Sequence, residues 1–342
     1  MAYPTSGRDL SATTINKWLT TDGGPVDCAY ANNAVLDTLK ETGKNQGKRG
    51  VPQQKSAFRT LDGGEFVQDT PLLVKSGAST NITGDEVITA VQTDPFKKAI
   101  WPLCMKVKIV TISEFDKMRN SGSEKMVDEE QGRITEGMSR LMYDVNYDIC
   151  TQDYATGVSS YTGVNGLPKL INSSGTSDTD VIAGITRANS TIPGWCNQAS
   201  TSVGAFKTYY TTLTTQRAVC DGANKGARWN LLLTTPTIWA AILNKYLSLG
   251  QVQLQNDKDP DTGYQSFRWL GAKVVMDQDI TAGYIYGIPT EDMWFAVNKN
   301  HNFKVGEAYD AQVQMVTARK MSFAGNIGFR RFNGCGVTTG WS

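Results

Sequence analysis

The sequence predicts an α+β fold built around one long helix, and three observations lead to this prediction. A single apolar stripe runs through residues 121–153, as expected of one long amphipathic helix. Segments rich in β-branched residues fill much of residues 85–120, directly before that helix. Helical and strand-like segments then alternate between residues 166 and 294. We therefore expect a helix that lies across a sheet, followed by a separate α/β domain.

The long helix is expected at about 123–153. Ser121, followed by Glu124 three residues later, fits a capping box at its start. The apolar residues of its stripe recur in steps of three, four or seven, with one doubled position: Val127, Ile134, Met138, Leu141, Met142, Val145 and Ile149. About 30 helical residues span roughly 45 Å, which is longer than most helices in compact domains. Gly132 and Gly137 each weaken it by up to about 1 kcal/mol relative to alanine, so we expect a sheet or neighbour to hold it; the spacing alone also fits an ordinary core helix.

The first 50 residues predict an N-terminal arm, because apolar residues are sparse and turn signals cluster there. One short helix is expected at about 31–42. The segment after it carries three basic residues among glycines, Lys44, Lys48 and Arg49. Two interpretations stay open for them: a solvated loop, or an arm that meets a neighbouring subunit or phosphate.

A β-hairpin is expected within residues 51–84. Phe58–Leu61 alternates in polarity, Asp62 and Gly63 form a hairpin-type turn signal, and alternation resumes in part from residue 65 to 74. An isolated hairpin has too little core to be stable alone, so we expect it to lie on another part of the chain or on another subunit.

The second half of the chain has the pattern of an α/β domain and a returning strand. Helices are expected at 205–221 and at 236–250, where Thr235 and Pro236 form a helix start. Strands are expected at 229–234, 267–276, 284–287 and 293–297. Residues 311–332 alternate for much of their length and predict a strand that completes the sheet begun before the long helix, whereas 334–342 are expected to be a loose end.

Composition limits the function classes. The chain of 342 residues carries 34 basic and 33 acidic residues, which argues against a dedicated nucleic-acid binder but not against weak contact per subunit. No apolar run approaches the ~18 residues of a membrane span, and no signal peptide is recognisable, so we expect no membrane association and folding in the cytoplasm. The six cysteines form no CxxC pair, which predicts buried apolar thiols and no zinc site.

The residues that usually carry catalysis do not gather into a motif. His301 is the only histidine, and it lies in a polar, turn-like stretch, so we expect no catalytic role for it. The segment 257–263 resembles a calcium loop, but its sixth and twelfth positions are Thr262 and Arg268. Asp277 and Asp279 are interpreted as turn residues. We therefore predict no catalytic residue, no cofactor and no metal site.

Several short segments, in their order along the chain, resemble a known family. They are Tyr143–Asp148 at the end of the long helix, Val164–Pro168, Ala183–Arg187 followed by Gly194–Trp195, Trp269–Asp277, and then Tyr286–Gly287 with Met293–Phe295. This order is similar to that of the major capsid proteins of tailed bacteriophages, which share the HK97-type fold. The resemblance covers residues 50 to 335, and it depends on the order and spacing of these segments.

The resemblance implies a division of the chain. Residues 1–50 would be the N-terminal arm, 51–84 the E-loop, 85–165 the first part of the P domain with its spine helix, and 166–294 the A domain. Residues 295–342 would return to the P domain and end the chain. The E-loop residues implied to contact a neighbour are Phe58, Leu61, Phe66, Val67 and Leu72. The arm residues implied to contact a neighbour or DNA are Lys44, Lys48 and Arg49.

The resemblance also implies a function. Such proteins form hexamers and pentamers that tile an icosahedral shell around double-stranded DNA. We accordingly expect a structural protein of the virion that is assembled in the host bacterial cytoplasm. Its partners would be copies of itself and, weakly, the packaged DNA, with scaffolding, portal and decoration proteins as further candidates.

Two alternatives remain open. The first is another virion structural protein, such as a decoration or tail subunit. The second is an α/β hydrolase that uses carboxylates, which would need two acidic side chains about 5 to 9 Å apart in one pocket.

Overall fold

The computed structural model describes residues 33–45, 58–64, 66–69, 98–119, 129–152, 163–177, 179–187, 195–201, 206–223, 228–248, 267–310 and 315–341. These residues belong to two compact units. Unit 1 contains the described residues of 105–144 and 300–324. Unit 2 contains those of 33–104, 145–299 and 325–342. Three long elements, β4, α4 and β14, have residues in both units.

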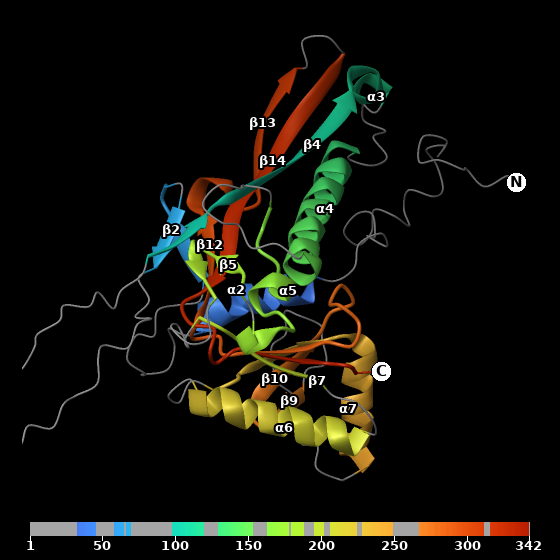
Figure 1. Ribbon diagram of the computed structural model, residues 1–342. Coiled ribbons are helices and arrows are strands. Elements are labelled where there is room, and N and C mark those ends of the chain that lie inside the picture. Colours follow the sequence, from blue (N-terminus) through green and yellow to red (C-terminus); the bar gives the residue numbers. More distant parts are fainter. Residues whose placement is uncertain are drawn as a thin grey trace, which may run out of the picture. The chain divides into compact units, whose positions relative to one another are not determined.

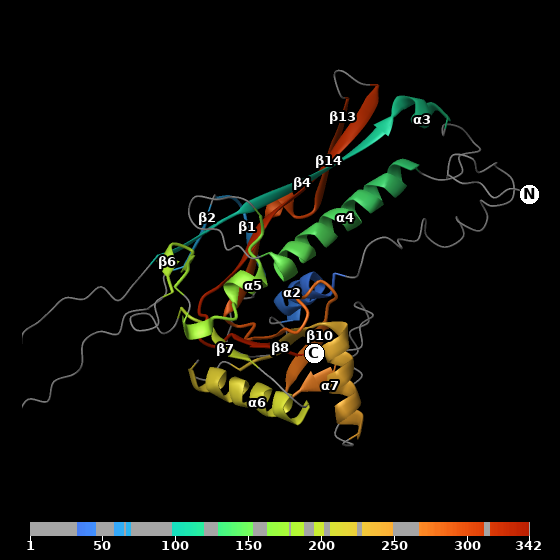
Figure 2. The same cartoon turned by 45° about the vertical axis from the view of Figure 1, so that its right-hand side comes forward.

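Unit 1 is a helix lying on a narrow sheet (Figures 1 and 2). Its elements are β4 (Cys104–Ser113), α3 (Glu114–Arg119), α4 (Glu129–Thr151), η2 (Lys299–His301), β13 (Lys304–Asp310) and β14 (Val316–Phe329). β13 runs antiparallel to β14, and β4 also pairs with β14. The predictions of a long helix on a sheet and of a returning strand that completes this sheet are therefore confirmed, and residues 121–128 of the expected helix lie outside the described residues.

Gly137 shows how closely α4 approaches the sheet of unit 1. A Cβ atom at this position would lie 2.5 Å from Cγ2 of Val110 on β4 and 2.9 Å from Cε of Met321 on β14. Both distances are too short for real atoms, so the helix can pack here only because residue 137 has no side chain. The glycine that weakens the helix thus permits the contact that holds it.

Unit 2 contains a sheet of six strands in the order β7-β15-β11-β8-β10-β9. Their bounds are β7 Gln198–Thr201, β8 Leu231–Thr234, β9 Phe267–Trp269, β10 Ala272–Met276, β11 Ile285–Ile288 and β15 Gly336–Thr339. The helices α6 (Phe206–Ala223) and α7 (Pro236–Ser248) pack on this sheet through a core that includes Trp229, Trp239 and Trp269. α2 (Ala34–Asn45) and α5 (Leu167–Leu170) lie on the opposite side in both views (Figures 1 and 2).

The end of the chain differs from the expectation of a loose end. β15 lies inside the six-stranded sheet, antiparallel to β11 and parallel to β7. Val337 is fully buried, and a Cβ atom at Gly336 would meet the ring of Trp229. The two neighbouring strands supply the hydrogen bonds that a short, glycine-containing segment cannot provide for itself.

The expected hairpin within residues 51–84 is wrong in its pairing. Both strands exist, as β1 (Phe58–Leu61) and β2 (Phe66–Asp69), but they do not pair with each other. β1 runs parallel to β12 (Met293–Asn298), and β2 runs antiparallel to β3 (Ala99–Pro102). The turn signal at Asp62 and Gly63 therefore redirects the chain between two sheets. A small hairpin, β5 (Val181–Ile182) with β6 (Ile185–Thr186), and the short helix η1 (Gly175–Ser177) complete unit 2.

Candidate functional site

Three buried groups of contacts in unit 2 determine where its connecting segments lie, and the first is an aromatic cluster beneath β2 and β3. Trp101 on β3 is fully buried, with its ring centroid 5.6 Å from that of Trp294 and 6.2 Å from that of Trp195. Phe332 stacks edge-on against Trp195 at 4.9 Å. Because Trp101 is paired with Val67 across the strands, this cluster anchors the pair β2 and β3.

Asn326 joins three segments next to that cluster. Its Oδ1 accepts a hydrogen bond from Asn165 N at 2.9 Å, and its Nδ2 donates to Pro102 O at 2.7 Å. Asn165 in turn donates from Nδ2 to Ile327 O at 2.9 Å. Both asparagines are fully buried, so these bonds replace water contacts that the side chains lose on folding. The end of β3, the segment before α5 and strand β14 are thereby held together.

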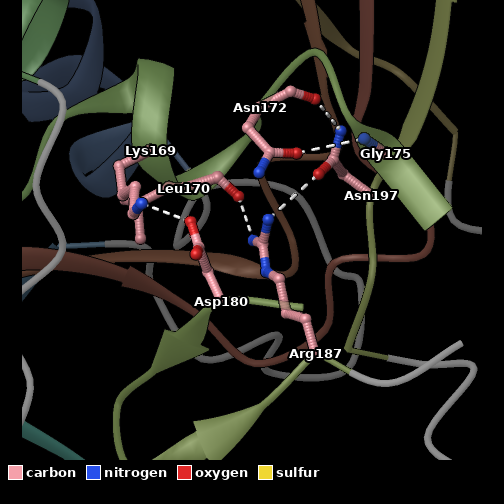
Figure 3. Close-up of polar contacts among 7 residues, drawn as sticks. All are labelled: Lys169, Leu170, Asn172, Gly175, Asp180, Arg187 and Asn197. Atoms are coloured by element: carbon pink, nitrogen blue, oxygen red, sulfur yellow. Dashed lines mark hydrogen bonds and ion pairs between the residues drawn. The ribbon is translucent and has the colours of Figure 1, made fainter. Parts of the chain in front are cut away.

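The second group surrounds Arg187, which is fully buried (Figure 3). Its Nη2 donates to Leu170 O and its Nη1 donates to Asn197 Oδ1 at 3.2 Å. The guanidinium carbon lies 4.6 Å from the ring centre of Phe332, within the range of a cation–π contact. Asn197 also donates from Nδ2 to Asn172 O at 2.8 Å. Arg187 and Trp195, which belong to the segments that carry the family resemblance, are thus buried packing residues.

Three smaller contacts close the same region of unit 2, and Figure 3 draws the first two. Lys169 of α5 forms an ion pair with Asp180, and Gly175 N donates to Asn172 Oδ1 at 3.0 Å. The backbone N of Arg187 donates to Asp180 O at 2.8 Å. Together with Arg187, these bonds hold residues 167–177 and 179–187 beside β7, at the edge of the six-stranded sheet.

The third group lies at the start of α2. Asp277, just after β10, and Asn146, on α4, contact the first turn of this helix through Val35 N and Leu36 N. Asp277 is 3% exposed, and burial raises the pKa of its carboxyl group, which the hydrogen bonds that it accepts only partly offset. Asp279 N donates to Asp277 Oδ1 at 2.9 Å, which confirms the turn role expected of these two residues.

Unit 1 carries an exposed apolar strand face. Met105, Val107 and Ile109 alternate along β4 and are each about half exposed, at 50%, 43% and 52%. The alternate residues of β4 point the other way: Lys106 Nζ donates to Asp144 O on α4 at 2.9 Å, and Val110 packs near Gly137. Residues of a strand alternate between its two faces, so the apolar row lies on the face away from α4.

The residues predicted to form interfaces are only partly described. Val67 is buried against Trp101, and Leu61 is half-buried in β1. Phe58 and Phe66 lie in β1 and β2, and Lys44 lies in α2, but their side chains are not among those described. Leu72, Lys48 and Arg49 lie outside the described residues. The interface roles of these residues therefore stay predictions, and Val67 contributes to the subunit's own core.

The described residues bear on the sequence predictions for metal sites, membrane helices, the histidine and the cysteines. None of the groups of His, Cys, Asp and Glu in the described ranges could hold a metal ion, and the calcium-like segment at 257–263 lies outside those ranges. No helix that the structure describes is long and apolar enough to cross a lipid bilayer. His301 Nδ1 lies 2.8 Å from Ser322 Oγ, a pairing that sequence analysis did not foresee. The five described cysteines are all buried, as predicted, and Cys28 lies outside the described residues.

Comparisons with known proteins give one consistent result at the level of the fold. No protein-family model and no curated protein matches the sequence. Among solved structures, the chain is similar to the capsid asymmetric unit of cyanophage A-1(L), with a TM-score of 0.65 and 14% identity over 93% of this chain and 95% of that chain. This chain has the HK97-type fold.

Two further structures with the HK97-type fold come from other kinds of particle. The holo-SrpI encapsulin complex from Synechococcus elongatus PCC 7942 matches with a TM-score of 0.55 and 10% identity, over 96% of each chain. The capsid of a native GTA particle matches with a TM-score of 0.53 and 10% identity, over 94% of this chain and 97% of that chain. In all three comparisons the HK97-type fold accounts for nearly the whole of both chains.

Proposed function

We propose that this chain is a major capsid protein that assembles as hexamers and pentamers into an icosahedral phage head around double-stranded DNA. The observation that carries the proposal is the likeness to three shell subunits over at least 93% of this chain and at least 95% of each of theirs. The capsid of cyanophage A-1(L) has the highest TM-score of the three, which favours a phage head.

The surface of unit 1 supports assembly. Met105, Val107 and Ile109 form a row of exposed apolar side chains on β4, and Phe115 and Met118 on α3 are also exposed. Contiguous exposed apolar residues on a soluble subunit are typical of a surface that another molecule covers. A neighbouring subunit in a shell is the partner that this proposal assigns to them.

The buried polar groups of unit 2 support a structural role in place of catalysis. The oxygens of Asp277 accept hydrogen bonds from Val35 N, Asn146 and Asp279 N, so this carboxylate is engaged in holding the chain together. That arrangement speaks against the hydrolase alternative, which needs two carboxylates available to a substrate.

We propose that the E-loop lies between β2 and β3, in place of the range 51–84 that the resemblance implies. Asp69 at the end of β2 is paired with Ala99 at the start of β3, so the two points that the segment between these strands connects lie side by side. We therefore assign the E-loop to this segment, which keeps Leu72 of the predicted interface residues within it. The P domain would then comprise 99–165 and 295–342, where the resemblance implies a start at 85, and the A domain would comprise 166–294.

The E-loop assignment can be tested by replacing residues 72–96 with a short Gly-Ser linker. Because β1, β2 and β3 are kept, we expect a folded subunit whose thermal unfolding midpoint lies within a few degrees of the wild type, but no closed shells in electron micrographs. A Gly-Ser replacement of the full length separates the effect of length from that of sequence. Normal shells from the short variant would refute the assignment.

The phage-head function is tested by expressing the protein alone and with the products of its neighbouring genes, followed by electron microscopy and nuclease protection. We expect closed polyhedral particles, and nuclease-resistant double-stranded DNA when a packaging system is present. Rings or tubes would instead indicate a tail protein, and binding only to preformed shells would indicate a decoration protein.

A protein compartment of the encapsulin type is the second candidate, because the encapsulin chain matches over 96% of both chains with a TM-score of 0.55. The two candidates differ in what the particle encloses, which is DNA for a phage head and a protein for a compartment. Closed shells that never protect DNA, and that retain a co-expressed protein, would favour this second function.

A further inference from the structure

The first turn of α2 is capped by side chains that are distant in sequence. Val35 N donates to Asp277 Oδ2 at 3.2 Å, and Leu36 N donates to Asn146 Oδ1 at 3.1 Å. The first N–H groups of a helix have no partner within the helix and are usually satisfied by a residue directly before it. Asn33 occupies that position, yet its Oδ1 has no hydrogen-bond partner among the described residues. The remote pair therefore takes the place of a local cap.

The two capping side chains also hold each other. Asn146 Nδ2 donates to Asp277 Oδ2 at 3.0 Å, and Asp279 N donates to Asp277 Oδ1 at 2.9 Å. Asn146 is fully buried and Asp277 nearly so. These hydrogen bonds orient both side chains independently of their contacts with α2. In addition, a carboxylate at a helix N-terminus interacts favourably with the helix dipole.

Apolar packing also holds α2, from its first turn to Leu39. Ala34, Val35, Leu36 and Leu39 are all buried, so the helix packs through its apolar side whether or not it is capped. Loss of the cap should therefore loosen the first turn and leave the remainder of α2, and unit 2 itself, in place.

We propose that Asn146 and Asp277 are positioning residues for subunit assembly, which hold the first turn of α2 and so fix the point at which residues 1–32 join unit 2. The inference rests on the proposed function, in which the N-terminal arm meets a neighbouring subunit. A fixed first turn lets every subunit present its arm from the same place, whereas a frayed one does not.

The test uses the full chain and two variants on different elements, Asn146→Ala and Asp277→Asn. Asn33→Ala is the matched control, because it removes an asparagine side chain beside the same turn whose Oδ1 accepts no hydrogen bond among the described residues. In unassembled subunits we expect the amides of residues 35–38 to exchange with deuterium roughly ten- to a hundredfold faster in both variants, as the loss of hydrogen bonds to a charged or buried acceptor implies. Amides of β8 should exchange as in the wild type, and the yield of closed shells should fall in both variants but not in Asn33→Ala.

The outcomes separate this inference from the function on which it rests. If the wild type forms no shells under any condition, the proposed function fails and the positioning role fails with it. If the wild type forms shells, unchanged exchange at residues 35–38 or an unchanged shell yield in the variants overturns the positioning role alone. Faster exchange in β8 would also overturn it, because the pair would then stabilise unit 2 as a whole.

Discussion

The carboxylate of Asp277 lies buried among the elements of unit 2, and burial raises its pKa above the ordinary value of 3.8. Hydrogen bonds from Asp279 N, Asn146 and Val35 N act in the opposite direction, and the charge of Asp279 raises the pKa further. The carboxyl group of Asp277 therefore stays protonated to a higher pH in the folded subunit than in the unfolded chain. As the pH rises from 3.8 through the raised pKa, the contribution of Asp277 to stability falls, because the ionised group costs more in the folded state.

This linkage predicts a difference between the wild type and Asp277→Asn. The free energy of unfolding of the wild-type subunit should fall relative to that of the variant as the pH rises from about 3.8, and the difference should become constant above the raised pKa. Urea unfolding of both proteins between pH 4 and 8 measures it. A difference that grows in favour of the wild type with rising pH would contradict the burial argument.

The buried thiols give a second prediction at this scale. Burial raises the pKa values of Cys150, Cys220 and Cys335 above the ordinary value of 9.0, and the thiolate is the reactive form. We expect these three thiols to stay unmodified by iodoacetamide at pH 8 in the folded subunit and to react fully in urea. Mass spectrometry of digested samples checks each site, and rapid labelling of Cys335 in the folded subunit would be the contrary result.

Single residues also mark where sequence analysis could and could not succeed. The turn role of Asp277 and Asp279 was readable from their local pattern. Their contact with Asn146 was not, because it joins residues 131 positions apart. One signal was present: Asn146 follows Met142 by four residues and precedes Ile149 by three, so it is a polar residue on the apolar stripe of the long helix. A buried asparagine at such a position needs a partner.

At the scale of the element, α4 depends on the absence of a side chain at residue 137. Gly137→Ala should raise helix propensity by up to about 1 kcal/mol. It also forces a methyl group onto Val110 and Met321, and such overpacking costs about 1–3 kcal/mol. We therefore expect a net loss of stability, measured by chemical unfolding of the subunit.

Gly222 in α6 provides the matched control for Gly137. A Cβ atom at Gly222 would have nothing within 4 Å, so Gly222→Ala should keep the gain in helix propensity without the clash. A stabilised Gly137→Ala variant would show that α4 can move away from the sheet without cost.

Helices were easier to predict than strand partners. The periods of α4, α6 and α7 are local patterns, and the expected ranges agree with the observed ones to within a few residues where the structure describes them. The partners of β1 and β2 are set by strands that lie far away in sequence, and a local turn signal wrongly suggested that they pair with each other. β15 was missed because its strand character comes from its neighbours in the sheet.

At the scale of the whole molecule, the order of parts was sufficient to predict the HK97-type fold, although every single motif was weak. Arg187 and Trp195 explain why the order of the segments indicates the fold. Both side chains are buried between segments, so they can make these contacts only in a fold that brings the segments together. Interfaces leave no comparable trace in one chain, so the residues that join subunits stay predictions.

The exposed row on β4 gives a prediction for assembly. Replacing Val107 and Ile109 together by lysine should leave the thermal unfolding midpoint of the subunit nearly unchanged, because both side chains are about half exposed. It should reduce the yield of closed shells at least tenfold, because two charges would be placed where a neighbour is expected to lie.

Thr111→Lys is a companion variant for this row, because Thr111 is exposed, follows Ile109 on the same face of β4, and receives one lysine where the double variant receives two. Electron microscopy and sedimentation measure the shell yield of both variants. Shells in wild-type amounts from the double variant would show that this face stays open to solvent.

The remote cap of α2 also has a consequence for the timing of synthesis. Val35 is made 242 residues before its partner Asp277, so the contact cannot form while the chain between them is still being translated. At the usual 5–20 residues per second this interval lasts about 12–50 s. The N-terminal segment therefore leaves the ribosome first, but the Asp277 cap that anchors α2 can form only after most of the chain has been translated.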